Sequence, residues 1–80
     1  MSVKMRLQRY GSHKKPFYRL VTINSKNKRD GKFLEILGTY EPLKNIINFD
    51  IIKIEKWLSL GVQPSQTVKN LLKKMKKMNN

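Results

Sequence analysis

Cationic and aromatic side chains gather near the amino terminus, within the fourteen residues from 6 to 19. The cations are Arg6, Arg9, Lys14, Lys15 and Arg19, and the aromatic residues among them are Tyr10, Phe17 and Tyr18. Ammonium and guanidinium groups bind phosphate oxygens, and aromatic rings stack on unpaired bases. Because no acid lies within this segment to neutralise the cations, the pattern indicates a surface for nucleic acid. The alternative is structural, with Phe17 and Tyr18 in a strand core and the cations on a solvated face.

A second group of cations, Lys26, Lys28, Arg29 and Lys32, follows in a stretch rich in Asn, Ser, Asp and Gly. This composition predicts a loop over residues 24–32 with a turn at Asp30-Gly31. Nucleic-acid phosphates would neutralise such a loop and release counterions. Both groups, together with Lys4, are therefore the predicted RNA-binding residues, and a merely flexible soluble loop is the alternative for the second group.

The charge of the 80-residue chain is +13 and is unevenly distributed. Residues 1–32 carry ten Lys or Arg against one acid, residues 33–63 carry three against four, and residues 64–80 carry five against none. Like charges at this density oppose compaction, and a polyanionic partner would relieve the repulsion. The length predicts one domain spanning residues 1–80.

Catalytic chemistry finds little support in the sequence. There is no cysteine and only one histidine, His13, which excludes a multi-histidine metal cluster, and no phosphate-binding glycine motif is present. We expect no cofactor, no small-molecule substrate and no enzymatic activity. The alternative is a metal-dependent nuclease in which Asp30 and Glu35 converge on Mg²⁺.

Alternating and helical patterns predict the elements that position these residues. Strands are expected at residues 3–7, 17–23, 33–40 and 46–48, with a basic loop from Tyr10 to Pro16. Helices are expected over residues 51–60, between an Asp50 N-cap and Gly61 after its end, and after a Ser65 cap. Strands followed by helices indicate an α+β fold, a small sheet of about four strands with two C-terminal helices packed against it.

Two helical faces supply the expected core. Ile51, Ile54, Trp57 and Leu58 share one face of the first helix, and burial of the Trp57 ring is expected. Val68, Leu71, Leu72, Met75 and Met78 form a stripe on the second, which we expect to pack on the sheet. A lysine-rich helix lying on a membrane surface is the alternative. No signal-peptide pattern or run of about 20 apolar residues is visible, which favours a cytoplasmic location without a membrane partner.

Several segments together resemble the S-sixteen family of bacterial-type small-subunit ribosomal proteins, from residue 3 to about residue 75. Their order and spacing make the match specific. The segments are Val3–Leu7, Arg9–Gly11, Lys14–Val21, Arg29–Glu35, Leu37–Tyr40, Trp57–Ser65 and Thr67–Val68. Departures are Ser12-His13, where the family often has bases, Lys28 in place of a common proline, and Glu41 in place of a common asparagine.

The resemblance implies a compact α+β domain that binds small-subunit ribosomal RNA and supports subunit assembly and translation. Neighbouring small-subunit ribosomal proteins would be its other partners. The family's contacts, carried onto this sequence, imply roles for Arg6, Arg9, Lys14, Lys15, Arg19 and Arg29. The location would then be the ribosome, in a cytoplasm or in an organelle with its own genome.

Overall fold

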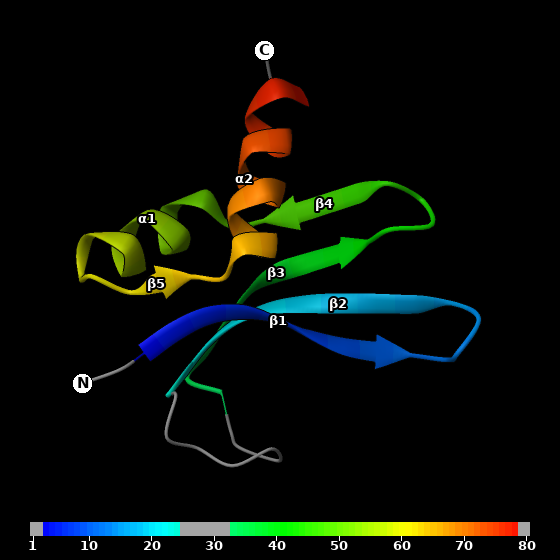
Figure 1. Ribbon diagram of the computed structural model, residues 1–80, viewed down its shortest axis with the longest axis horizontal. Coiled ribbons are helices and arrows are strands. Elements are labelled where there is room, and N and C mark those ends of the chain that lie inside the picture. The colour runs from blue at the N-terminus through cyan, green and yellow to red at the C-terminus, as the bar shows by residue number, and fades with distance from the viewer. Residues whose placement is uncertain (1–2, 25–32, 79–80) are drawn as a thin grey trace.

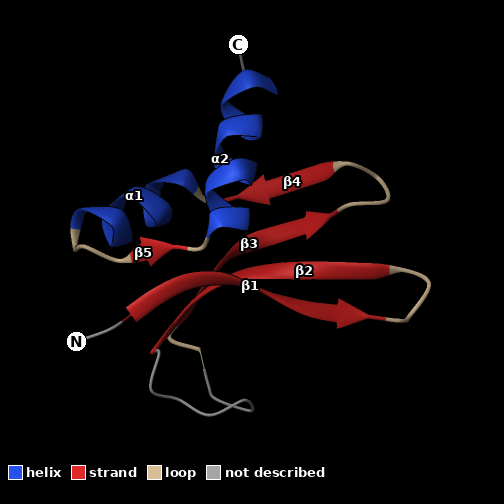
Figure 2. Cartoon of the chain, viewed as in Figure 1, coloured by secondary structure: helices blue, strands red, loops and turns tan. Residues whose placement is uncertain are grey.

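Strands fill the first part of the chain and helices most of the remainder (Figures 1 and 2). The computed structural model describes residues 3–24 and 33–78. The elements are β1 (Val3–Gly11), β2 (Pro16–Asn24), β3 (Glu35–Glu41), β4 (Ile46–Phe49), α1 (Ile51–Ser59), β5 (Gln63–Pro64) and α2 (Gln66–Met78). This order confirms the predicted α+β class.

The strands form one sheet in the order β4-β3-β2-β1-β5. The first four are antiparallel neighbours, whereas β5 runs parallel to β1. Helix α1 therefore lies in the connection from one edge of the sheet to the other. The prediction of about four strands missed β5, because two residues that include a proline carry no strand pattern.

Strand β1 is longer than predicted. It continues past Leu7 to Gly11 and pairs with β2 without interruption, from Val3 opposite Asn24 to Gly11 opposite Pro16. The predicted basic loop is therefore confined to a tight turn, in which the Lys15 amide donates to the Ser12 carbonyl at 3.2 Å. Strand β3, in contrast, starts at Glu35, two residues later than predicted.

A close approach of backbone fixes the middle of β3. The register between β2 and β3 shifts at Leu20 and Val21, and Leu37 is the extra residue. At the next position, Gly38, a Cβ atom would lie 2.4 Å from the Asn48 carbonyl oxygen. Only glycine fits there, so this residue lets β4 pack tightly beside β3.

The core lies between one face of the sheet and the two helices. Met5, Leu20, Leu37 and Phe49 come from the strands, and Ile54, Val68, Leu71 and Met75 come from the helices. Three of the stripe residues of α2, Val68, Leu71 and Met75, are buried in this cluster. The stripe therefore packs on the sheet, as predicted, rather than facing outward.

The helix boundaries agree with the capping residues. The Asp50 carboxylate accepts a hydrogen bond from the Lys53 amide at 3.2 Å, and the Ser65 hydroxyl accepts one from the Val68 amide at 3.3 Å. Gly61 follows the end of α1 with φ of 89°, the left-handed conformation expected of a C′ glycine. These caps place α2 directly after β5.

Trp57 is only half-buried, which corrects the expectation of burial. Its indole Nε1 donates a 2.7 Å hydrogen bond to Glu35 Oε1, so the polar edge of the ring must stay near the rim of the core. On the same helix face Ile54 is buried, whereas Ile51 and Leu58 remain partly exposed. The face thus covers the core less completely than its apolar pattern suggests.

Candidate nucleic-acid interface

The β1–β2 hairpin carries the described cations of the first predicted group. Successive side chains of a strand point to opposite faces, so the continuous register assigns each one to a face. The inner face is the one that holds Met5 and Leu20, toward the helices. The outer face carries Lys4, Arg6, Gln8, Tyr10, Phe17 and Arg19, and the inner face carries Arg9 and Tyr18. The predicted cluster is therefore divided between two surfaces.

Arg19 is held in place on the outer face by aromatic rings. The rings of Tyr10 and Phe17 are stacked with centroids 5.6 Å apart, and the Arg19 guanidinium carbon lies 4.4 Å from the Tyr10 centroid. The Tyr10 hydroxyl in turn donates to Gln8 Oε1 at 3.0 Å. A guanidinium over an aromatic ring is stabilised there while its N–H edges stay available to a phosphate.

The turn of the hairpin presents the next cations. Lys14 and Lys15 are exposed there. Arg9 is also exposed, and its Nη2 donates a long hydrogen bond of 3.4 Å to the His13 carbonyl. Because all three side chains are exposed, phosphate oxygens could accept hydrogen bonds from them.

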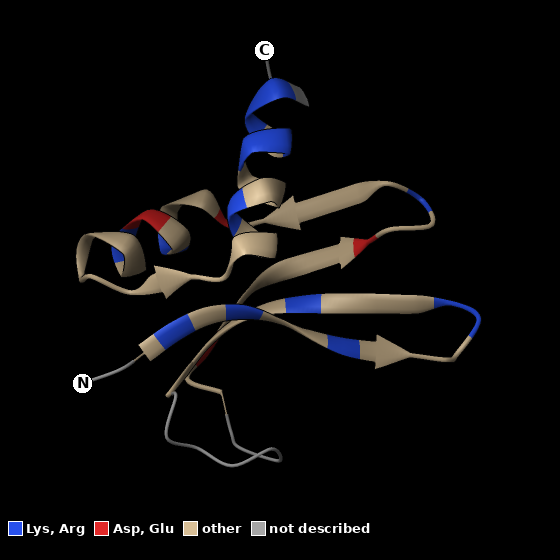
Figure 3. Ribbon diagram, viewed as in Figure 1, with Lys and Arg blue, Asp and Glu red and all other residues tan. Residues whose placement is uncertain are grey.

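Acidic partners for these cations are missing from residues 3–24 and 33–78. The salt bridge of this part of the chain joins Lys44 to Glu41 at 3.9 Å and involves none of the predicted site residues. Figure 3 shows Lys and Arg along β1, β2 and the hairpin turn, with acids placed elsewhere. Uncompensated cations on a paired hairpin fit a polyanionic ligand.

The second predicted group, Lys26, Lys28, Arg29 and Lys32, lies outside the described residues, as does the predicted turn at Asp30-Gly31. Their proposed role depends on the sequence alone. The interpretation of Phe17 and Tyr18 as strand core is wrong, because both side chains are half-buried and neither belongs to the core cluster.

Helix α2 carries a further cationic surface that the site prediction omitted. Lys69, Lys73, Lys76 and Lys77 are exposed on it, and much of the helix is basic in Figure 3. Lys74 instead donates to Asn45 Oδ1 at 2.6 Å and ties the helix to the β3–β4 turn. The excess of five lysines over residues 64–80 was the signal available in the sequence.

The nuclease alternative gains no support from the described residues. No group of three or more His, Cys, Asp or Glu side chains that could hold a metal ion occurs among them. Glu35 accepts the hydrogen bond from Trp57, and Asp30 lies outside the part of the chain described. The described helices also include none long and apolar enough to cross a membrane.

A small basic α+β protein with a cationic strand hairpin is the class that this fold and surface define. Comparison with known proteins gives the family. The family model described as Ribosomal protein S16 matches residues 9–65. The chain is 68% identical over 79 residues to the small ribosomal subunit protein bS16 of Phytoplasma mali, covering 99% of this chain and 98% of the relative. Identity to that of Acholeplasma laidlawii is 54%, with 99% of each chain covered.

The chain thus belongs to the ribosomal protein S16 family, and the predicted resemblance is confirmed. This family is a structural, non-enzymatic component of the small ribosomal subunit, which also confirms the prediction that the protein is not an enzyme. The relatives belong to bacterial-type ribosomes, and the organellar alternative is not borne out.

Proposed function

We propose that this chain binds folded small-subunit ribosomal RNA as one domain and supports assembly of the subunit and translation. The observation that carries the proposal is the set of cations on the β1–β2 hairpin that lack acidic partners within the described residues. The relatives' names, which state a place in the small subunit, support it.

The proposed mechanism is neutralisation of converging phosphates by a rigid element. Because the hairpin is paired along its full length, its cations keep fixed spacings. The residues proposed to contact RNA are Lys4, Arg6, Arg9, Lys14, Lys15, Arg19, Lys26, Lys28, Arg29 and Lys32. Folded RNA is recognised mainly through shape, phosphates and 2′-hydroxyls, so we expect little readout of paired bases.

Neighbouring ribosomal proteins are the second proposed class of partner. Large apolar side chains remain exposed outside the hairpin, including Ile52 at 81%, Leu60 at 68% and Leu43, in the β3–β4 turn, at 70%. Ile52 belongs to α1 and Leu60 directly follows it, and α1 carries none of the proposed RNA contacts. Contact with another protein would bury such residues.

Co-sedimentation with small ribosomal subunits, followed by mapping of protein–RNA crosslinks, tests the proposed function. We expect the protein to travel with the particles and its crosslinks to fall on the β1–β2 hairpin, with the turn residues Lys14 and Lys15 prominent. A protein that stays at the top of the gradient, or one whose crosslinks are confined to α1, would contradict the proposal.

A further inference from the structure

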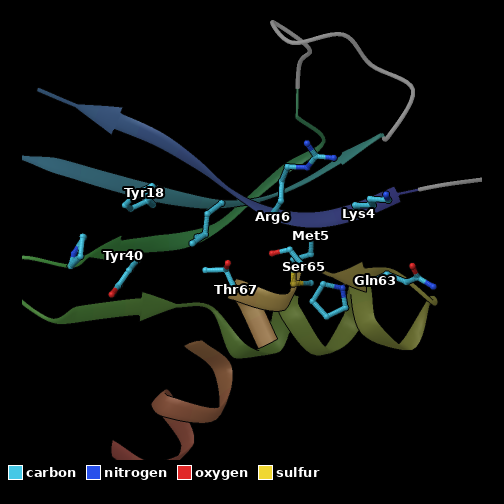
Figure 4. A pocket seen from close by; sticks show the side chains of 11 residues that line it. Lys4, Met5, Arg6, Tyr18, Tyr40, Gln63, Ser65 and Thr67 are labelled. Atoms are coloured by element: carbon cyan, nitrogen blue, oxygen red, sulfur yellow. The ribbon is translucent and has the colours of Figure 1, made fainter. Parts of the chain in front are cut away.

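A groove opens on the inner face of the β1–β2 hairpin, between β1 on one side and the segment from β5 to the start of α2 on the other (Figure 4). Its volume is about 770 Å³, within the range of roughly 300–1,000 Å³ typical of small-ligand sites. Leu7, Tyr18 and Tyr40 line one end, and Pro64, Ser65 and Thr67 line the side formed by β5 and α2. The groove exists because β5 ends after two residues while β1 continues.

Two stacked tyrosines line one end of this groove. The rings of Tyr18 and Tyr40 are stacked with centroids 6.1 Å apart and an interplanar angle of 28°. Both residues are half-buried, so part of each ring remains accessible. Figure 4 shows the two side chains facing the groove from neighbouring strands, with Thr67 across from them. An accessible aromatic surface of this kind stacks on a planar base.

Cationic and main-chain donors lie beside the two tyrosines. Arg9 is directly opposite Tyr18 in the β1–β2 register and shares its face. Met5 accepts a hydrogen bond from the Ser65 amide and so directs its main chain toward β5. Leu7, two residues on, directs its N–H and C=O to the same edge, which no strand of the described chain pairs with beyond Met5.

The charge around the groove favours an anionic occupant. No acidic side chain is among the described lining residues; Lys4 and Arg6 border the groove, although their side chains point to the outer face, and Arg9 is the cation that shares the inner face with Tyr18. An aromatic pair beside a guanidinium matches the two parts of a nucleotide, the base and its phosphate. A base within a duplex has both faces covered by its neighbours, so only an unpaired base can stack in the groove.

We propose that this groove holds an unpaired nucleotide of the bound RNA. Its base stacks on the accessible face of the Tyr18–Tyr40 pair, and its phosphate contacts Arg9. The inference rests on the proposed RNA binding and adds to it a site that reads single-stranded structure, separate from the phosphate-binding outer face. The protein thereby selects RNA in which a base is displaced from the helix at the point of contact.

Nuclear magnetic resonance of the full chain with two short RNAs tests the site without the ribosome. The probes are single-stranded hexa-adenylate and a blunt RNA duplex. We expect hexa-adenylate to shift the ring signals of Tyr18 and Tyr40 clearly more than those of Tyr10 and Phe17, which lie beside Arg19 on the outer face. The duplex should leave the Tyr18 and Tyr40 signals in place. Equal shifts on both faces, or shifts confined to the outer face, would overturn the inference.

Matched substitutions give a second measurement. Replacing both groove tyrosines, Tyr18→Leu with Tyr40→Leu, should weaken hexa-adenylate binding about 5- to 150-fold, as expected for one lost stacking contact of about 1–3 kcal/mol. The control Ile52→Ala removes an exposed apolar side chain from α1, away from the proposed RNA contacts, and should change binding of hexa-adenylate less than twofold. Tyr18→Phe with Tyr40→Phe keeps the rings and should restore binding. If the leucine variant does not fold, the ring shifts of the unmodified protein still decide.

The outcomes separate this inference from the proposed function. If the leucine variant binds both hexa-adenylate and small-subunit ribosomal RNA as tightly as the unmodified protein, the groove site is wrong and RNA binding stands. If the unmodified protein binds neither RNA, both proposals fail together. A groove that is occupied by a peptide strand along the β1 edge would give no ring shift with hexa-adenylate, which also overturns the inference.

Discussion

The two ends of the β1–β2 hairpin belong to the same ladder but differ in how far their side chains are buried. At the end away from the turn, Met5, Leu20 and Val21 are fully buried, although Leu20 and Val21 point to opposite faces of β2. Toward the turn, Arg9, Lys14 and Lys15 are exposed and have no acidic partner among the described residues. One strand pair thus joins a core to a charged surface.

The difference shows how a small basic protein holds repelling charges in a fixed arrangement. An 80-residue chain has a thin stability margin. Packing at the buried end stabilises the β1–β2 ladder. Because the backbone pairing continues to the turn, the turn end is ordered although it has no core of its own. Stability and RNA binding should therefore respond to different substitutions.

Leu20→Ala should have the largest effect on stability. Leu20 is fully buried in the core cluster, and truncation of such a residue costs about 2–5 kcal/mol. Urea unfolding followed by circular dichroism measures the change. In the folded fraction, affinity for small-subunit ribosomal RNA should remain close to that of the unmodified protein. A drop in affinity without a drop in stability would contradict the proposal that the buried end of the hairpin stabilises the fold and the turn end binds RNA.

Trp57→Ala should have a smaller effect on stability, about 2–3 kcal/mol, because the ring is half-buried. Trp57→Phe separates packing from the hydrogen bond to Glu35 and should cost about 1 kcal/mol. Thermal melts of both variants check this order. An unaltered melting temperature for the alanine variant would mean that the indole contributes nothing to the core.

The combined variant Lys14→Ala, Lys15→Ala and Arg19→Ala should act in the opposite way. Stability should change by about 1 kcal/mol or less, since the lysines are exposed and the Arg19 contact to Tyr10 is weak. Filter binding should show clearly reduced affinity for small-subunit ribosomal RNA. The matched control removes the same charge from residues 33–63, through Lys44→Ala, Lys53→Ala and Lys56→Ala. It should bind small-subunit ribosomal RNA almost as tightly as the unmodified protein.

Lys44→Ala alone should have the smallest effect. Its salt bridge to Glu41 is 3.9 Å long and exposed, with side-chain exposures of 73% and 43%. Such pairs contribute at most about 0.5 kcal/mol, since solvent and salt screen them. Both the unfolding midpoint and the affinity for RNA should stay within experimental error. A larger loss of affinity would place the β3–β4 turn in the RNA interface.

Sequence patterns predicted the elements better than the site. The caps at Asp50 and Ser65 and the glycine at Gly61 were predictable, because capping is a local interaction between neighbouring residues. The apolar stripe of α2 was predictable because the spacing of apolar residues along a helix is also a local pattern. Strand β5 was not, since only its pairing with β1 defines it.

The site depended on register, which the sequence does not contain. Because Tyr10 and Gly11 resemble loop residues, the sequence pattern predicts an end of β1 that is too early. Without the full β1–β2 register, it does not show that Arg9 and Arg19 lie on opposite faces. Tyr40 was missed altogether, because it meets Tyr18 only through the pairing of β2 with β3. The cations themselves were found from charge alone, but their arrangement was not.

The salt dependence of binding to small-subunit ribosomal RNA tests the central claim most directly. If about six to ten phosphates are neutralised, the logarithm of the binding constant should fall against the logarithm of salt concentration with a slope of roughly −4 to −9. The combined hairpin variant should lower that slope by about 2–3, while the Lys44, Lys53 and Lys56 control leaves it unchanged. A flat salt dependence, or equal slopes for the hairpin and control variants, would contradict a phosphate-binding role for the hairpin.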